Sequence, residues 1–231
     1  MTIAIGTIGA FTIGTGNRTP AFGGTYAIGD LILYNTGQYQ GSNILTFPDN
    51  TYTLLTPNVS CKQVQVYGKI ALSTSETIPT VNWGATAQGF AQLCTVTGVD
   101  SSLTNLISAA ERISNSNANI VGIASTRTPS QNNALMWFLG ERNKTSTSDG
   151  TSYSTPTNWT IAAQSHNNGT NPSIVVAYWI QTTATAVVSS LGFNGSIADG
   201  SAQSMQATMI SLGMAAAPVI TPTRSLLGVG T

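Results

Sequence analysis

Charged residues are scarce in this chain of 231 residues. Lys and Arg number 8, Asp and Glu number 8, and together they make up 7% of the sequence at a formal net charge of zero. About 25% is usual for a globular domain. Without an excess of cations, the chain lacks the attraction that dominates binding to nucleic acids and to anionic lipids. We therefore expect neither a nucleic acid nor a membrane surface as a partner.

Long apolar runs and targeting signals are also missing. The longest apolar candidates, around residues 174–180, have the length of a strand and fall short of the roughly 18–20 residues of a membrane span. The first six residues lack the basic start of a secretory signal. These features predict a soluble protein that is made and folded in a cytosol.

Cysteine and histidine are too few for the sites they usually build. Cys61 and Cys94 are the two cysteines, and their spacing matches no metal site. We interpret both as reduced packing residues, with one disulfide between them as the alternative. His166 is the single imidazole, and the chain has no Gly-x-Ser-x-Gly turn. We expect an exposed loop histidine rather than the base of a catalytic triad.

The acidic residues follow no catalytic pattern. Glycoside cleavage needs two carboxyl groups about 5–10 Å apart. Most of the eight stand beside Gly, Ser, Asn or Thr, where an acidic side chain commonly binds its own backbone in a turn. They are Asp30, Asp49, Glu76, Asp100, Glu111, Glu141, Asp149 and Asp199. Phosphate-binding and metal-binding motifs are missing too. We predict a protein that is not an enzyme, with no cofactor and no catalytic, cofactor-binding or metal-binding residue.

Uncharged polar residues are abundant instead. Thr, Ser, Asn and Gln fill 87 of the 231 positions. Their hydroxyl and amide groups can be buried against another subunit with hydrogen bonds and without the desolvation cost of ions. A monomer usually protects its surface and strand edges with charge, which this chain lacks. We therefore expect a homo-oligomer, a dimer or a trimer.

The hydrophobic pattern predicts an all-β fold. Short β-branched or aromatic runs recur along the chain between clusters of Gly, Asn, Ser, Thr and Pro. Residues 31–34 form a continuous apolar run, typical of a strand buried on both faces. Residues 63–72 alternate, which predicts one set pointing inward and the other toward solvent or a partner. The inward set is Val64, Val66, Gly68, Ile70 and Leu72, and the outward set is Gln63, Gln65, Tyr67, Lys69 and Ala71.

Further strands are predicted on both sides of two connecting segments. Residues 100–112 indicate a short helix or an irregular connector, with Asp100 as a possible cap. Residues 142–157 are too polar to pack, which predicts an exposed, mobile loop. The other expected strands are 45–47, 52–55, 81–83, 89–99, 120–124, 134–139, 159–164, 174–181, 186–191 and 205–212.

The chain divides into a body and two arms in this interpretation. Residues 21–212 would form a two-sheet, jelly-roll-like β-sandwich in which two weakly similar halves, 21–100 and 113–212, each contribute to both sheets. Residues 1–20 fit an extended arm or an edge strand, and residues 213–231 fit a C-terminal arm. Arms of this kind are suited to lie across neighbouring subunits.

Two groups of side chains leave alternatives open. Glu141, Arg142 and Lys144 form the densest charge cluster, which we interpret as a solvated loop face, with an inter-subunit salt bridge as the alternative. The tryptophans lie in or beside predicted strands, which favours packing inside the fold, with a sugar-stacking surface as the alternative. The four are Trp83, Trp137, Trp159 and Trp179.

The order of several strands resembles that of a group of tailed-phage virion proteins. A Gly-Asp-hydrophobic strand begins at Gly29, Tyr52-Thr53 follows, residues 66–71 form an aromatic-and-lysine strand, and residues 79–81 read Pro-Thr-Val. Residues 90–100 then end in Gly-Val-Asp. The similarity covers roughly residues 25–212; Tyr52 stands where Trp is usual in the group, and Gly68 separates the aromatic residue from the lysine.

This resemblance implies a structural role in a phage particle. The expected function is that of a non-enzymatic capsid decoration or cement protein that bridges capsomers. Its partners would be the major capsid protein or other virion proteins, and it would reside in the virion, assembled in the host cytoplasm. A tail or baseplate component is the alternative within that class, and a carbohydrate-binding host-adhesion module is the alternative outside it.

Overall fold

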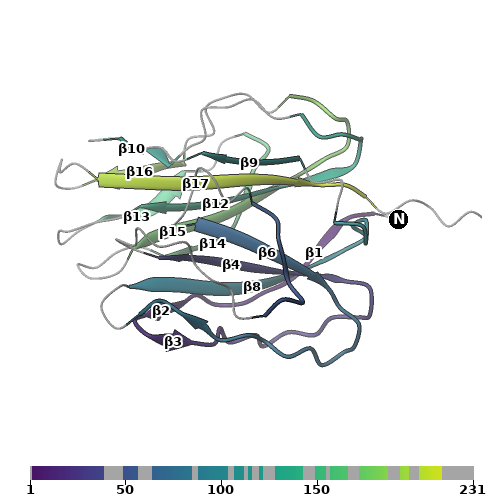
Figure 1. Ribbon diagram of the computed structural model, residues 1–231. Coiled ribbons are helices and arrows are strands. Elements are labelled where there is room, and N and C mark those ends of the chain that lie inside the picture. The colour runs from purple at the N-terminus through teal and green to yellow at the C-terminus, as the bar shows by residue number, and fades with distance from the viewer. Residues whose placement is uncertain are drawn as a thin grey trace, which may run out of the picture.

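The computed structural model is all-β, as the sequence predicts, and holds no helix in the part of the chain that it describes. Figure 1 shows the strands lying in layers, with the N-terminus at one end of the molecule. The described residues are 2–38, 49–56, 64–84, 88–103, 107–111, 114–115, 120–121, 128–142, 149–154, 157–165, 172–186, 193–197 and 203–214.

The first half of the chain forms an antiparallel sheet of six strands. Its strand order is β1-β8-β4-β6-β5, and β2 also pairs with β8. The strands are β1 (Ala4–Ile8), β2 (Thr12–Gly14), β4 (Leu31–Gln38), β5 (Thr53–Leu54), β6 (Val64–Ile70) and β8 (Gly89–Thr97). Two short strands outside this sheet, β3 (Asn17–Arg18) and β7 (Val81–Asn82), pair with each other.

The second half forms another antiparallel sheet of six strands, in the order β10-β17-β12-β15-β14, with β9 also pairing with β17. Three further strands form a smaller sheet in the order β11-β16-β13. The larger sheet consists of β9 (Ile107–Glu111), β10 (Ser114–Asn115), β12 (Ala134–Arg142), β14 (Thr160–Ser165), β15 (Ser173–Gln181) and β17 (Gln203–Leu212). The smaller one consists of β11 (Ile120–Val121), β13 (Asp149–Ser154) and β16 (Phe193–Ile197).

The two large sheets repeat one strand order. The order β1-β8-β4-β6-β5 matches β9-β17-β12-β15-β14, and in both cases the strands follow one another along the chain in the same sequence. We call residues 4–97 and 107–212 the two repeats. The prediction that each half contributes to both sheets is wrong, because each described sheet draws its strands from one half. Neighbouring strands such as β5 and β6, or β14 and β15, pair directly, and β8 and β17 return to pair with earlier strands of their own half.

The pairing registers extend the match between the two repeats to single residues. Thr53 of β5 lies opposite Gly68 of β6, and Thr160 of β14 lies opposite Tyr178 of β15. Thr53 and Thr160 each begin the edge strand of their repeat. The two repeats therefore align residue by residue at this edge.

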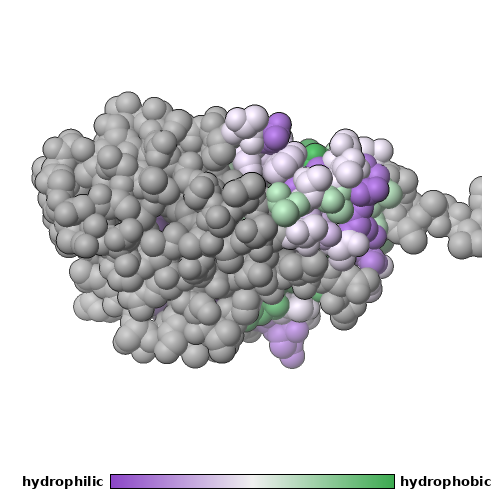
Figure 2. Space-filling view, turned by 90° about the horizontal axis from the view of Figure 1, so that it is seen from above, coloured by the Kyte–Doolittle hydropathy of each residue, from purple (hydrophilic) through white to green (hydrophobic). Residues whose placement is uncertain are grey.

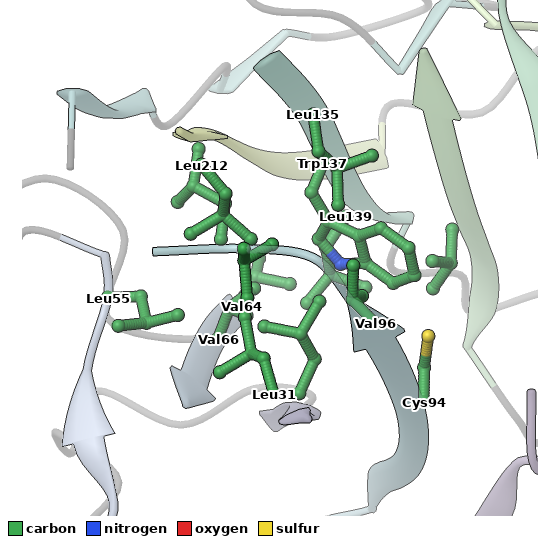
Figure 3. Close-up of a cluster of buried hydrophobic side chains, with 14 of the residues drawn as sticks. Leu31, Leu55, Val64, Val66, Cys94, Val96, Leu135, Trp137, Leu139 and Leu212 are labelled. Carbon is green, nitrogen blue, oxygen red and sulfur yellow. The ribbon is translucent and has the colours of Figure 1, made fainter. Parts of the chain in front are cut away.

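One hydrophobic core lies between the two large sheets. Alternate residues of β12, namely Leu135, Trp137 and Leu139, point into it, and residues of β4, β6 and β8 meet them from the first sheet. In Figure 3, these three side chains lie over Val66 and Val96 of the first sheet. The two repeats thus bury their inner faces against each other.

The outer face of the first sheet is buried as well. Ile32 and Tyr34 of β4 pack there with Trp83, which follows β7. Residues 31–34 are therefore buried on both faces, as the continuous apolar run predicts.

The predicted alternation along residues 63–72 holds for the inward residues only as far as Ile70, which packs against the shared core. Val64 and Val66 are buried in the shared core as predicted, but Gln65 and Tyr67 are also buried, at 1% and 6% exposure. Leu72, predicted to point inward, is 76% exposed. The outward prediction fails because loop residues cover this face of the sheet, a feature that a two-residue period does not encode.

Residues near the N-terminus belong to the body of the chain. β1 and β2 both pair with β8, and Ile3 is buried in the shared core. The backbone N–H of Gly9 donates to the carbonyl of Leu93 at 2.8 Å, and the N–H of Thr7 donates to Oγ1 of Thr95. The edge-strand alternative is the one that the structure shows for this segment. The C-terminal arm lies outside the described residues beyond Met214.

Two predicted connectors contain strands. Residues 107–111 form β9 rather than a short helix, because their backbone pairs with β17, and Asp100 instead accepts the N–H of Ser102 in a turn. Within residues 142–157, predicted as a loop, Arg142 ends β12 and residues 149–154 form β13. The predicted strand at 45–47 lies outside the described residues, as does 186–191 apart from Ala186.

Candidate functional site

Three of the aspartates bind their own backbone, as the sequence predicts. Asp30 accepts the N–H of Ala27 at 2.7 Å, and Asp49 accepts the N–H of Thr51 at 2.8 Å. Asp100 forms the turn already described. These carboxylates therefore shape turns. Glu111 and Asp149 lie in strands but their side chains lie outside the described part, as does Asp199.

One cluster of ionisable and aromatic side chains lies on the outer face of the first sheet. Lys69 of β6 forms an ion pair with Glu76 at 2.7 Å, with both side chains largely buried, and its ammonium lies 5.6 Å from the ring centre of Tyr52. The second oxygen of Glu76 accepts the backbone N–H groups of Leu72 and Ser73. Glu76 thereby joins a turn to the strand beside it.

The electrostatic environment of this cluster favours the ionised form of its carboxyl groups. The hydrogen bond from Lys69 holds the pKa of Glu76 below its ordinary value, and the bonds from Leu72 and Ser73 act in the same direction. The backbone N–H of Thr51 lowers the pKa of Asp49. Both carboxyl groups are therefore anions at neutral pH. A glycosidase pair needs one carboxyl that keeps its proton, so this cluster does not have that chemistry.

Most of the tryptophans are buried. Trp83, Trp137 and Trp159 are 2%, 0% and 6% exposed, and Trp179 is partly buried against Trp159. The Trp159 ring also meets Phe138 edge to face. Packing inside the fold, rather than a sugar-stacking surface, describes these three rings.

A chain of buried amides connects the two sheets. The indole Nε1 of Trp137 donates to Oδ1 of Asn35 at 2.9 Å, and Nδ2 of Asn35 donates to Oε1 of Gln92 at 3.1 Å. Nε2 of Gln92 then donates to the carbonyl of Gly9 at 2.9 Å. The chain runs from the second repeat through the first to the N-terminal segment. Sequence reasoning missed it, although an Asn directly after an apolar run is a signal that could have pointed to it.

Glu141 corrects the interpretation of the charge cluster. The sequence predicts a solvated loop face for it, together with Arg142 and Lys144, but its side chain is 2% exposed at the end of β12. Burial raises its pKa to about 8. The strand continues past the apolar residues because its backbone pairs with β15 and β17 as far as Arg142. The side chain of Arg142, and Lys144, lie outside the described part.

The remaining sequence candidates are either buried or outside the described residues. Cys94 is a free, fully buried thiol whose pKa is raised by burial. Cys61 and His166 lie outside the described residues. Among the residues that the structure places, no three His, Cys, Asp or Glu side chains gather where they could hold a metal ion. Nor does any helix there have the length and apolarity to cross a membrane.

Among the residues that the structure describes, two large apolar side chains are exposed, which sequence reasoning missed. Ile28 and Leu72 are 68% and 76% exposed. They lie at one end of the first sheet, because Gly29 donates to the carbonyl of Ala71 beyond the last β4–β6 pair. The described part of the face in Figure 2 is mostly near-neutral or hydrophilic, with scattered hydrophobic residues.

The described C-terminal residues lie toward the same end of the fold. Leu31, at the start of β4, lies opposite Val96 of β8, and Val99, three residues further on, forms a bridge with Met214. Figure 1 shows β17 ending on the side of the molecule where the N-terminus lies. We call this region, with Ile28, Leu72 and Met214, the terminal end.

Compared with family models, curated proteins and solved structures, the chain matches none of them.

Proposed function

We propose that this chain is a non-enzymatic structural component of a tailed-phage particle, a capsid decoration or cement protein that forms homo-oligomers and bridges capsomers. In this proposal its partners are the major capsid protein or other virion proteins, and it resides in the virion. The observation that carries the proposal is the terminal end, where two large apolar side chains stand exposed in a chain with only 7% charged residues. Exposed apolar side chains that lie next to each other are suited to burial in a contact with another protein.

The terminal end is prepared for contact by its backbone. The turn that holds Ile28 is closed by a hydrogen bond from Ala27 to Asp30, and Leu72 donates its N–H to Glu76. Both apolar side chains therefore stand on backbone that is already ordered. A preordered surface loses less conformational entropy when it binds.

The finer architecture belongs to the same proposal. A two-sheet sandwich of the jelly-roll kind is supported by the core shared between the sheets. One feature departs from the jelly-roll kind. The two large sheets do not exchange strands, because each takes its strands from one repeat. A rigid two-layer body suits a mechanical role, and the burial of Trp83, Trp137 and Trp159 favours that role over glycan binding.

Sedimentation velocity on the full chain tests the proposal. The expected result is a dimer or trimer that dissociates when a charge enters the terminal end through Leu72→Asp or Ile28→Asp. Asn17→Asp, at an exposed position of β3 toward the opposite end of the first sheet, adds the same charge there and should leave the mass unchanged. A wild-type chain that stays monomeric at every concentration would count against the proposal.

A further inference from the structure

Glu141 occupies a place in the fold that otherwise holds apolar side chains. It is the next residue after Leu135, Trp137 and Leu139 on the face of β12 that points into the shared core. Neither of its carboxyl oxygens has a hydrogen-bond partner. An unpaired buried carboxylate costs several kcal/mol when ionised, because the ion has lost its water. The neutral acid costs much less.

No positive charge in the described residues faces Glu141. Ile174 of β15 and Gln206 of β17 lie directly opposite it, and both are buried. Strands β4, β8, β14, β15 and β17 contain no charged residue. The charged residue of β6, Lys69, pairs with Glu76 on the outer face.

The other titratable side chains that the structure describes near this face are remote from Glu141. Tyr178 stacks on Trp137, four residues along β12, and Cys94 lies in the first sheet. Glu111 of β9 lies opposite Ala207 of β17, and its side chain lies outside the described part. The position therefore contains a single carboxyl group with no described counter-ion.

We propose that Glu141 is a proton-dependent latch between the two repeats. The protonated carboxyl lets the inner faces close on each other at this end of β12, and the ionised carboxylate forces that end to open so that water reaches the charge. The first repeat has no comparable group, because strand pairing aligns Leu33 with Trp137 and so places Gly37 at the position of Glu141.

Ionisation of Glu141 lowers the stability of the folded chain. The pKa of Glu141 is about 8 in the folded chain, above its ordinary value of 4.5, so the folded state binds the proton more tightly than the unfolded state. The stabilisation that comes from the bound proton of Glu141 is complete below pH 4.5 and is lost as pH rises toward 8. Over that window the unfolding equilibrium constant should rise about tenfold per pH unit from this group.

Urea unfolding of the full chain between pH 4.5 and 9.5 tests the latch, with Glu141→Gln as the main variant. The amide keeps the size of the side chain and cannot ionise, so the rise in the unfolding constant should disappear. Glu76→Gln removes a carboxyl from an ion pair instead and should keep the rise above pH 5. Equal pH dependence in wild type and Glu141→Gln would overturn the latch.

Two measurements on the wild-type chain keep the test independent of that variant. Carbon-detected NMR should find one glutamate carboxyl that titrates near pH 8, and an ordinary titration for every glutamate would overturn the proposal. Amide hydrogen exchange should accelerate above pH 8, beyond the intrinsic base-catalysed rise, at residues 139–142 and 206–208 more than at residues 31–35. Uniform acceleration would show general loss of stability and would overturn the local opening.

Discussion

Tyr52 and Trp159 occupy equivalent positions in the two repeats and make the same kind of contact. Each directly precedes the edge strand of its sheet, and each ring meets an aromatic ring of the central strand edge to face. The ring centroids of Tyr34 and Tyr52 lie 6.1 Å apart with an interplanar angle of 80°. Those of Phe138 and Trp159 lie 6.3 Å apart with an interplanar angle of 78°. The repeated strand order thus extends to the packing of single side chains on the outer faces.

The neighbour on the other side differs between the repeats. Lys69 lies over the Tyr52 ring, whereas Trp179 meets the Trp159 ring edge to face. In the aligned registers Lys69 corresponds to Trp179, since each follows the residue opposite Thr53 or Thr160. One position therefore holds a cation–π contact in the first repeat and an aromatic pair in the second.

We predict that Gly89→Ala destabilises the fold by about 1–3 kcal/mol. Gly89 begins β8, and an added Cβ would overlap the ring of Trp83, which is itself buried. Gly23→Ala is the matched control, because a Cβ there meets nothing within 4 Å. Chemical denaturation of both variants should show a lower midpoint for the first and an unchanged or slightly higher one for the second.

The bond between the sheets should be measurable as a coupling energy. Trp137→Phe leaves Oδ1 of buried Asn35 without its donor, so we expect a loss of about 1–3 kcal/mol. Asn35→Ala and the double variant complete a thermodynamic cycle, which should give a coupling of at least about 0.5 kcal/mol. Strictly additive effects would show that the bond does not join the repeats.

Acid should weaken the contact between Lys69 and Glu76. Because the pKa of Glu76 lies below its ordinary value of 4.5, the pair stabilises the fold above that pH and loses this effect as pH falls further. Thermal melting of wild type and Glu76→Gln should therefore differ at pH 6 and converge toward pH 2. A constant difference across this range would contradict the assignment.

Cys94 should be unreactive until the chain unfolds. Its thiol is fully buried, and burial raises its pKa, so little thiolate is present at neutral pH. In a Cys61→Ser background, a disulfide reagent should label no thiol in buffer and one thiol in denaturant. Rapid labelling of the folded chain would contradict the placement of Cys94 in the core.

Removing residues 215–231 should separate assembly from folding. The described fold ends at Met214, which pairs with Val99, so the truncated chain should keep its unfolding midpoint. If the C-terminal segment fastens neighbouring subunits, association and particle binding should fall. Unchanged association would count against this role for the segment.

The sequence predicts the positions of the strands much better than it predicts which segments pack over their faces. Continuous or alternating apolar residues mark β4, β6, β12 and β15, because a buried face imposes its own period. The burial of Gln65 and Glu141 is not predictable in this way, because it depends on segments distant in sequence that pack over them. The short strand β9 was missed for a related reason, since its partner β17 lies about 100 residues further along the chain.

The exposure of the terminal end also could not be predicted from the local sequence pattern. Leu72 continues the alternation of β6 and reads as a core residue, but the strand ends at Ile70 and the chain turns at the following residues. Its exposure depends on that turn. The sequence does predict the low charge of the chain as a whole, because composition alone determines that property.

Cryo-electron microscopy of purified phage particles that carry this chain tests the central claim most directly. The account predicts ordered copies of the two-repeat body on the outside of the head, in contact with one another and with the capsid lattice. Particles that lack the chain altogether, while the protein remains in the lysate as a free monomer, would contradict a structural role in the virion.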